Sequence, residues 1–307
     1  MRACVDVGGT KVAVSLSPKA GEPLVGRLTE PTAKTGDNDA LARQIIRLID
    51  QACAQQGVDV ADVACVGVST CGPFQLRDGM VELATPNICG GLAGPERDAP
   101  NRWLTAQLEA PLKQRFGRVR VENDGIAALE AERRWGALQG LAHCAYVTWS
   151  TGVGVGLCVD GRILRGKNGN AGHAGHSFVV DDDSSTCGCG NVGDVEALVA
   201  GSGVANRLGQ SAAELMAAAQ RGEPSALQVT DALCRIMGRL LYNLVATLDL
   251  ERISLGGSVF WHNRDLLLPR LREEVQAHLP ALTSGAQIVP AGLGDRVGDY
   301  AALALLD

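Results

Sequence analysis

The sequence lacks any run rich in lysine and arginine. Its 28 basic residues are outnumbered by 34 acidic ones, which gives a formal net charge of −6. A protein that binds nucleic acid through its backbone needs clustered cations facing the phosphates. We therefore expect no nucleic acid partner.

Long apolar runs are missing as well. No segment reaches the roughly 18 consecutive apolar residues that are needed to span a bilayer. Met1 leads directly into the alternation Ala3, Val5 and Val7, without the basic and apolar regions of a secretory signal. The sequence also contains no low-complexity linker. These absences predict a soluble, cytoplasmic protein without a membrane partner.

A disulfide framework is not expected, although the chain contains ten cysteines. Such frameworks belong to small secreted domains, whereas most of these cysteines stand in apolar runs, where a reduced thiol packs as a small hydrophobic group. The cysteines in apolar runs include Cys4, Cys65, Cys144 and Cys158. Only Cys187 and Cys189 differ, because they stand together in a glycine-rich segment.

The order of local patterns is typical of an α/β protein. Short β-rich runs punctuated by glycine alternate with stretches of helical period. In Asp39 to Gln56 the apolar residues fall on one face, after Asp37 and Asn38 as candidate caps, whereas Ala226 to Leu250 is apolar nearly all round and predicts a buried central helix. The predicted strands are Ala3 to Val7, Val12 to Leu16, Val63 to Ser69, Val119 to Glu122, Ala145 to Trp149, Val153 to Val159, Ile253 to Leu255 and Ala286 to Val289.

The length of 307 residues and a hydrophobic content of 46% allow two domains, each with its own core. We place the boundary near Gly117, where a helical stretch gives way to the strand Val119 to Glu122. The prediction is an N-terminal domain of residues 1–117 and a C-terminal domain of residues 118–307. The last helix, from about Gly298, is expected to fold back on the first domain.

A glycine pair follows the first predicted strand, in Asp6-Val-Gly-Gly-Thr-Lys11. Strand alternation resumes at once in Val12 to Leu16, so the glycines close a β-hairpin. A dinucleotide fold or a P-loop would need a helix here, because helix N-terminal amides meet the phosphate. Two glycines with positive φ could instead form an anion-binding nest beside the Thr10 hydroxyl and the Lys11 ammonium. The alternative is a plain hairpin turn.

The segment Tyr146-Val-Thr-Trp-Ser-Thr-Gly-Val-Gly-Val-Gly156 repeats this plan in the second half of the chain. Two such hairpins suggest a duplicated architecture that holds a polyphosphate. A third glycine turn, with Gly256 and Gly257 in Ile253 to Val259, could let an adenosine lie close to the backbone, or could be an ordinary strand-ending turn.

Asn123 and Asp124 stand where a predicted strand ends and a helix begins, at about Ile126. Such strand ends carry the ligand sites of α/β sheets. A carboxylate there can accept the proton of a sugar hydroxyl that attacks a γ-phosphoryl group, and Asn123 can bind another hydroxyl. The alternative is that Asp124 only caps the helix.

A second polar cluster contains His176, Cys187, Cys189 and Asp194. Imidazole, two thiolates and a carboxylate are a plausible tetrahedral set for a structural zinc ion. The Cys-x-Cys spacing is tighter than usual, and a carboxylate is an uncommon fourth ligand. The alternative is a glycine-rich loop with two free thiols.

Several segments together resemble the ROK family of sugar kinases and repressors. They are DVGGTK, VENDGIAALEAERRWGA, STGVGVG, GHAGH…CGCGNVGDVE and LGGS, which cover nearly the whole chain in order. The resemblance implies an actin/hexokinase-like (ribonuclease H-like) fold of two duplicated α/β domains with a cleft between them. It also implies ATP and Mg²⁺, a possible structural Zn²⁺ and a homodimer.

The resemblance assigns roles to individual residues. Asp124 would be the catalytic base and contact the sugar, and Asp6 would lie near the magnesium. The sugar pocket would contain Asn87, Asn123, His176 and Glu196. The phosphate contacts would be Gly8, Gly9, Thr10, Thr151 and Gly152. The zinc ligands would include His176, Cys187 and Cys189.

Two positions depart from the pattern. Most members of the family have a third cysteine where this chain has Asp194, which leaves open whether zinc is bound. His173 stands where glucokinase-type members have a sugar-binding glutamate, and N-acetylmannosamine kinases resemble this chain here. A neutral imidazole can donate a hydrogen bond, for example to an acetamido carbonyl, whereas a carboxylate only accepts. The sugar therefore stays open between glucose and an amino or N-acylamino hexose.

The predicted function is an ATP-dependent 6-kinase of an aldohexose or hexosamine. The alternative is a non-catalytic, sugar-responsive regulator of the same family. We expect it less, because such repressors carry a helix-turn-helix segment ahead of the first strand, and here that strand begins at Ala3.

Overall fold

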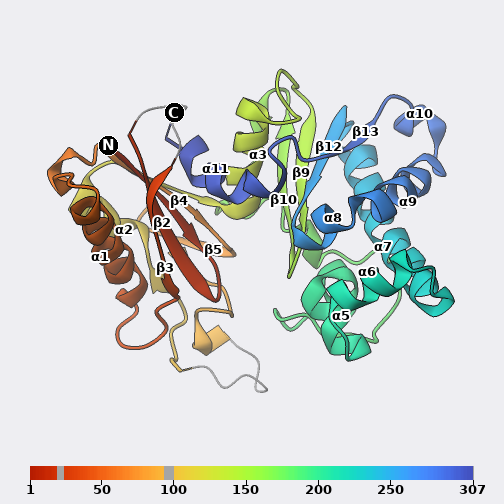
Figure 1. Cartoon of the computed structure of the whole chain (residues 1–307), viewed down its shortest axis with the longest axis horizontal. Coiled ribbons are helices and arrows are strands. Elements are labelled where there is room, and N and C mark those ends of the chain that lie inside the picture. The colour runs from red at the N-terminus through yellow and green to blue at the C-terminus, as the bar shows by residue number, and fades with distance from the viewer. Residues whose placement is uncertain (19–23, 93–99, 307) are drawn as a thin grey trace. The chain divides into compact units, whose positions relative to one another are not determined.

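The computed structural model describes residues 1–18, 24–92 and 100–306, and they form two compact units (Figure 1). Unit 1 contains Met1–Ala131, Arg165–Asn170 and Gly298–Asp307, and unit 2 contains Glu132–Leu164 and Ala171–Val297. Among the described residues, no helix is both long and apolar enough to cross a membrane.

The main sheet of unit 1 has the order β3-β2-β1-β4-β8. Its first three strands form an antiparallel meander, and β1, β4 and β8 run parallel to one another. The strands are β1 (Arg2–Val7), β2 (Lys11–Ser17), β3 (Val25–Pro31), β4 (Cys65–Thr70) and β8 (Val119–Asn123). Of these strands, only β3 was not predicted from the sequence.

Helices pack against both faces of this sheet, and successive residues of β4 point to one face and then to the other. Val66 and Val68 join the core that includes α1 (Ala40–Gln55), and α1 and α2 (Glu109–Phe116) lie side by side in Figure 1. Gly67 points the other way, where an added Cβ would stand 2.3 Å from the Ala302 carbonyl oxygen of α11 (Val297–Ala304). The period of two along β4 therefore serves two separate helix layers.

The unit boundary differs from the predicted one near Gly117. Because β8 pairs with β4, this strand and the start of α3 (Asp124–Trp135) belong to unit 1. The helix-to-strand transition at Gly117 is real, but the partner of a strand decides its domain, and the local pattern does not reveal that partner. The last helix, apart from its first residue, lies in unit 1.

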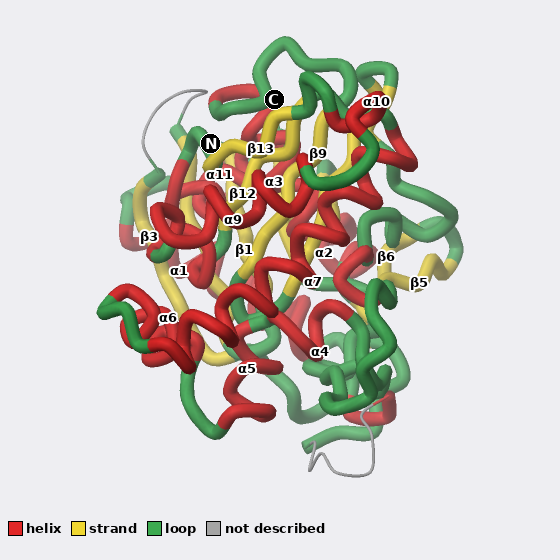
Figure 2. The backbone as a smooth tube through the Cα atoms, turned by 90° about the vertical axis from the view of Figure 1, so that its right-hand side faces the viewer, coloured by secondary structure: helices red, strands yellow, loops and turns green. Residues whose placement is uncertain are grey.

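A small second sheet in unit 1 was not predicted. It contains β5 (Phe74–Arg77), β6 (Met80–Leu83) and the short β7 (Ala106–Gln107). Figure 2 shows β5 and β6 as a short pair of strands, separate from β1. These strands are two to four residues long, too short for a recognisable alternation.

Unit 2 repeats the plan of unit 1 with the sheet order β11-β10-β9-β12-β13. An antiparallel hairpin of β9 and β10 is followed by β12, parallel to β9, as β1 and β2 are followed by β4. The predicted duplication is therefore confirmed. The strands are β9 (Cys144–Trp149), β10 (Val153–Val159), β11 (Arg162–Ile163), β12 (Arg252–Gly256) and β13 (Gln287–Pro290).

The helices of unit 2 lie in two stretches of the chain, one between β11 and β12 and the other between β12 and β13. They are α4 (Val195–Val199), α5 (Gly201–Leu208), α6 (Ala212–Gln220), α7 (Pro224–Leu248), α8 (Ser258–His262), α9 (Arg264–Gln276) and α10 (Pro280–Thr283). α7 packs against α6 and α9.

Two predictions about helices were wrong. α7 is not buried all round: residues such as Met237 and Leu241 are buried, whereas Asp231 and Arg235 are exposed on its other face. The residue before α1 is Asp39, and its side chain makes no capping hydrogen bond, so neither Asp37 nor Asn38 is the cap.

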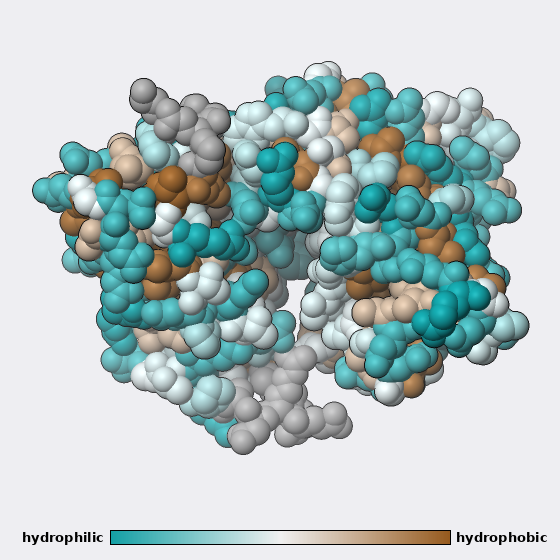
Figure 3. All heavy atoms as spheres, in the orientation of Figure 1, coloured by the Kyte–Doolittle hydropathy of each residue, from teal (hydrophilic) through white to brown (hydrophobic). Residues whose placement is uncertain are grey.

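Exposed apolar side chains are scattered. On the face drawn in Figure 3, hydrophilic residues predominate and hydrophobic ones form small, separate patches. Large exposed apolar residues include Leu76, Leu104, Phe178 and Leu279. Single exposed residues of this kind are normal on a folded protein.

Glu132, on α3 at the start of unit 2, is fully buried. Its carboxylate accepts hydrogen bonds from the Ser254 hydroxyl at 3.0 Å, the backbone N–H of Ala137 and Gly292 at 2.9 Å, and that of Leu293 at 2.8 Å. The carboxylate thus joins α3 to β12 and to the turn that precedes α11.

We expect Glu132→Ala to lower the free energy of unfolding by about 3 kcal/mol, because it leaves buried donors without an acceptor. Chemical denaturation measures the change. Glu223→Ala removes an exposed carboxylate as the control and should change the free energy by less than about 0.5 kcal/mol. Equal effects of the two substitutions would contradict this role of Glu132.

Candidate functional site

The carboxyl ends of β1, β4 and β8 meet at one edge of the unit 1 sheet. Val7 pairs with Thr70, and Thr70 pairs with Asn123, so these residues form one row across the three parallel strands. The residues that follow this row are Gly8, Cys71 and Asp124. Ligand sites of α/β proteins lie at such an edge.

The first glycine hairpin is present, but its glycines are not needed for the predicted reason. Neither Gly8 nor Gly9 has a positive φ, and the Gly8 N–H donates to the Lys11 carbonyl at 2.9 Å. The Gly8 N–H therefore takes no part in an anion-binding nest. Gly9 lacks a side chain because an added Cβ would stand 2.9 Å from the Cβ of Asn87.

Gly9 and Asn87 are therefore neighbours, although they were predicted to contact different substrates. Gly9 belongs to the hairpin assigned to phosphate, and Asn87 belongs to the set assigned to the sugar. Asn87 is exposed on a turn after β6, which is held by hydrogen bonds from Ile88 and Cys89 to the Thr85 carbonyl. The sequence analysis did not predict that these two residues are neighbours.

Charged side chains surround Asp6, two residues before the first glycine hairpin. Burial raises the pKa of Asp6, although Arg27 and Lys11 act to lower it. Burial, together with the charges of Asp124 and Asp6, raises the pKa of Cys71 to about 12. Both carboxylates therefore act on one thiol at this sheet edge, and Cys71 itself is protonated at neutral pH.

Asp124 begins α3, directly after the buried Asn123. The Gly125 N–H donates to the Asp124 carboxylate at 2.8 Å and to Asn123 Oδ1 at 2.9 Å. The contact typical of a helix cap is made by Asn123, whose side chain accepts the N–H two residues on, whereas Asp124 accepts the N–H of the next residue. A carboxylate can accept more than one hydrogen bond, including one from a substrate hydroxyl.

The second hairpin is held by Glu196. The Val153 N–H donates to Glu196 Oε2 at 2.8 Å, and an added Cβ on Gly152 would stand 2.8 Å from the same oxygen. The start of α5 supports the turn from another side, because the Ser202 hydroxyl donates to the Thr151 carbonyl at 2.7 Å. Sequence analysis gave no sign of this part played by Ser202.

Gly256 and Gly257 are required by close packing against β9. An added Cβ on Gly256 would stand 2.3 Å from the Tyr146 hydroxyl, and one on Gly257 would stand 2.5 Å from the Trp149 carbonyl oxygen. Gly257 also has a φ of +87°. The strand-ending turn therefore accounts for both glycines by itself.

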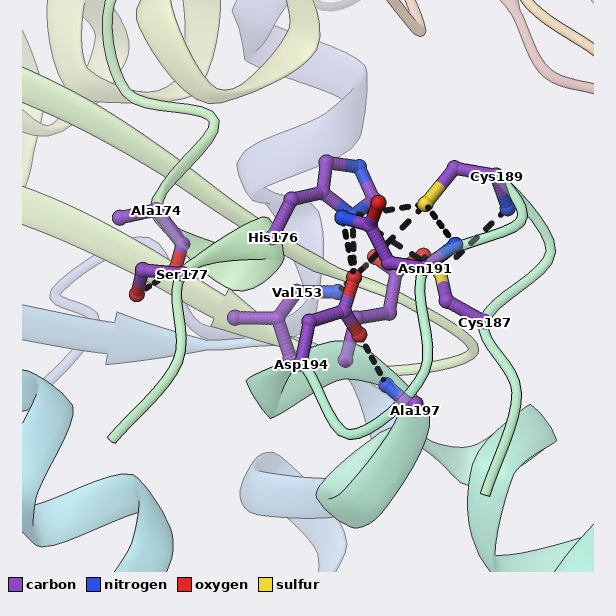
Figure 4. A network of polar contacts seen from close by, with 10 residues as sticks. Val153, Ala174, His176, Ser177, Cys187, Cys189, Asn191, Asp194 and Ala197 are labelled. Atoms are coloured by element: carbon purple, nitrogen blue, oxygen red, sulfur yellow. Dashed lines mark hydrogen bonds and ion pairs between the residues drawn. The ribbon is translucent and has the colours of Figure 1, made fainter. Parts of the chain in front are cut away.

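His176, Cys187, Cys189 and Asp194 converge on one point in unit 2 (Figure 4). Their ligand atoms all lie within 4.8 Å of one another. His176 Nδ1 lies 3.0 Å from Asp194 Oδ2, 3.7 Å from Cys187 Sγ and 3.6 Å from Cys189 Sγ. Zinc bonds of about 2.0 to 2.3 Å in a tetrahedron place the donor atoms about 3.3 to 3.8 Å apart. The two distances from His176 to the thiols fall in this range, the distance to Asp194 is shorter, and the chemistry of the donor set fits a zinc ion.

The two carboxylate oxygens of Asp194 have different partners. Oδ1 accepts the Ala197 N–H at 2.7 Å and caps α4, whereas Oδ2 faces His176. Burial acts to raise the pKa of Asp194, but hydrogen bonds from His176, Ala197 and Asn191 outweigh it and lower the pKa. The bond to Asp194 raises the pKa of His176, and burial raises that of the Cys187 thiol.

His173 stands beside this cluster. Its ring stacks on His176 with the centroids 5.8 Å apart, and among the described residues its buried Nε2 has no hydrogen-bond partner. Burial lowers the pKa of His173, and the neighbouring His176 lowers it further. A neutral imidazole with an unused nitrogen can donate or accept one hydrogen bond.

The predicted site residues thus form two groups. Unit 1 brings together Asp6, Gly8, Gly9, Thr10, Lys11, Asn87, Asn123 and Asp124. Unit 2 brings His173, His176, Cys187, Cys189 and Asp194 close to Glu196, Thr151 and Gly152. Glu196 links the two parts of the second group, because Cys187 Sγ lies 3.4 Å from its Oε1. Gly256 and Gly257 stand at the end of β12, against Tyr146 and Trp149 of β9.

Comparison with known proteins shows similarity along nearly the whole chain. The model of the ROK family matches residues 2–307. Glucokinase of Aeropyrum pernix is 30% identical over 328 residues, which cover 98% of this chain and 95% of the relative. N-acetylmannosamine kinase of Shigella boydii is 33% identical over 265 residues, with 83% and 82% covered. The crystal structure of a ROK family glucokinase from Streptomyces griseus in complex with glucose and AMPPNP is 28% identical, with a TM-score of 0.71 and 98% and 97% covered.

Proposed function

The chain belongs to the ROK family and is a sugar kinase with the actin/hexokinase-like fold, and from that premise we propose that it phosphorylates the 6-hydroxyl of an aldohexose or hexosamine with ATP. The supporting observation is the sheet edge of unit 1, where the glycine hairpin and Asp6 stand at the end of β1 and Asp124 follows β8, the two parallel strands that flank β4.

Asp124 would act as the general base. Phosphoryl transfer requires the attacking oxygen to be positioned and its proton accepted as the bond forms. Asp124 Oδ1 accepts the Gly125 N–H, and the carboxylate would accept the hydroxyl proton. Asn123, fixed by the same N–H, would orient the sugar, and Asn87 would contact it beside the hairpin.

The two hairpins would bind ATP. Thr10 and Lys11 offer a hydroxyl and an ammonium beside the first turn, and both are exposed. Thr151 and Gly152 offer the second turn, which Glu196 fixes from behind. Asp6 would be the carboxylate near the Mg²⁺ ion, which would supply positive charge to the phosphates. Gly256 and Gly257 would border the adenosine.

We propose that His176, Cys187, Cys189 and Asp194 hold a structural zinc ion. The support is the distances among their donor atoms and the fact that Oδ2 of Asp194, which takes no part in the helix cap, faces His176 and Cys189. The ion would order the loop between His176 and α4. The helix that follows this loop, α4, carries Glu196, which holds the second hairpin and is assigned to the sugar.

The function is tested by a coupled ADP-release assay with glucose, mannose, glucosamine, N-acetylglucosamine, N-acetylmannosamine and 3-amino-glucose. At least one sugar should support turnover well above the sugar-free rate. A regulator without catalysis would bind sugar and release no ADP. The homodimer stays a prediction, which light scattering during size exclusion would test.

His173 would set the choice of sugar. We expect His173→Glu to raise kcat/KM for glucose relative to that for N-acylated hexosamines by about tenfold, because glutamate cannot donate to an acyl carbonyl. The ratio of kcat/KM for the two sugars measures this choice. His262→Glu, on an exposed residue of α8, controls for the added charge. An unchanged ratio in His173→Glu would exclude His173 from substrate selection.

A further inference from the structure

Six residues, Arg165–Asn170, belong to unit 1 although the chain on both sides of them belongs to unit 2. We call this segment the strap. It follows β11 and precedes the segment Ala171-Gly-His173. Neither the motifs nor the proposed chemistry give it a role, yet both of its ends are tied to unit 1 by side-chain contacts.

Arg165 is the first anchor. Its Nε donates to Glu122 Oε1 at 2.6 Å, and its Nη2 donates to Glu130 Oε1 at 3.1 Å. Both carboxylates are buried, with 7% and 6% exposure. Glu122 stands on β8 two residues before Asp124, and Glu130 stands on α3, which Asp124 begins. The strap is therefore bound to β8 and α3, the two elements that meet at the proposed base.

Asn170 is the second anchor. Its Oδ1 accepts the Phe74 N–H at 2.7 Å, and its Nδ2 donates to the Phe74 carbonyl at 2.8 Å. The amide thus satisfies both polar groups of one β5 residue, as a neighbouring strand would. Gly169 has a φ of +81°, and an added Cβ there would stand 3.2 Å from the Phe74 ring.

The chain is fixed again shortly after the strap. Gly172 has a φ of +99°, and an added Cβ would stand 2.1 Å from the Val155 carbonyl oxygen of β10. Only Ala171 separates this residue from Asn170. His173 follows directly, so its backbone position depends on an anchor in unit 1 and on a close contact in unit 2.

We propose that Arg165 and Asn170 are positioning residues for sugar binding, which act through the strap by holding His173 in place. The identity of the ligand in this inference rests on the proposed function. The effect of the strap on the position of His173 does not, because it is a property of the protein without ligand.

Arg120 provides a matched control. Its Nη2 donates to Glu122 Oε1 at 3.0 Å, and it also bonds both Glu130 oxygens. The side chains of Arg120 and Arg165 are similarly exposed, at 34% and 42%. Each arginine thus neutralises the same two carboxylates when the other is removed, but only Arg165 belongs to the strap.

The experiment compares Arg165→Ala, Asn170→Ala and Arg120→Ala with the unchanged protein. We expect the first two to raise the sugar KM and the calorimetric sugar Kd about tenfold, with kcat and the KM for ATP within about threefold, because small misplacements of binding groups are costly. Arg120→Ala should change the sugar constants less than about threefold. Arg165→Lys should recover part of the loss. Equal effects of Arg120→Ala and Arg165→Ala would overturn the proposal.

Hydrogen exchange separates this inference from the proposed function, because it needs no sugar and no turnover. In the free protein, Arg165→Ala and Asn170→Ala should speed amide exchange in residues 171–176 about tenfold, and Arg120→Ala should not. Unchanged exchange in all three variants would overturn the strap. A lack of ADP release by the unchanged protein with every sugar would overturn the function and leave the exchange result standing.

Discussion

Asp124→Asn is expected to lower kcat by a factor of about 10² to 10⁴. The amide cannot accept the hydroxyl proton, whereas its Oδ1 can still accept the Gly125 N–H that now binds the carboxylate at 2.8 Å. The start of α3 should therefore stay intact, and sugar affinity should stay within about threefold. Steady-state kinetics gives kcat, and calorimetry with the sugar alone gives the affinity.

The control for this substitution is Asp265→Asn, which removes a carboxylate from the first turn of α9 in unit 2. It should leave kcat nearly unchanged. Turnover of Asp124→Asn close to that of the unchanged protein would exclude Asp124 as the base. A loss of sugar binding together with turnover would show that the carboxylate is needed for the ground state as well.

Cys189→Ala is expected to reduce the zinc content of purified, dialysed protein from about one equivalent to below about one tenth. Cys189 is the exposed member of the cluster, so its truncation removes a ligand without opening a cavity in the core. Three remaining ligands bind zinc much more weakly than four, and dialysis removes the ion. Elemental analysis by mass spectrometry measures the change.

The control is Cys234→Ala, a buried thiol on α7 outside the cluster, which should retain the metal. Asp194→Asn tests the fourth ligand, because the amide keeps an oxygen for the Ala197 N–H and loses the negative charge that faces His176. It should bind zinc more weakly than the unchanged protein. A full equivalent of zinc in Cys189→Ala, or less than about one tenth in the unchanged protein, would contradict the site.

The sequence predicted both hairpins correctly, but positive φ was the wrong reason for the two glycines of the first one. Gly8 and Gly9 follow a strand, and the alternation resumes at Val12, which is enough to predict a hairpin because the signal is local. The glycine at position 9 is required by Asn87, which approaches from another part of unit 1. No local pattern reveals such a contact, so positive φ was inferred where close packing is the cause.

The domain boundary shows the same limit. The transition at Gly117 was located correctly, since α2 ends at Phe116 and β8 begins at Val119. The unit to which β8 belongs depends on its pairing with β4. The strap was missed for a related reason: Arg165 and Asn170 are ordinary polar residues in the sequence, and their partners lie far away along the chain.

The sequence alone determined that this chain is an α/β protein of duplicated plan, because hydrophobic period and glycine turns are local properties. Its motifs, read together and in order, also determined the family. The tertiary structure decided which residues are neighbours: Asn87 with Gly9, Glu196 with the second hairpin, Asp194 with His176, and Arg165 with two buried glutamates. These contacts depend on how strands pair and helices pack over long separations, and such pairing is chosen by the free energy of the whole fold.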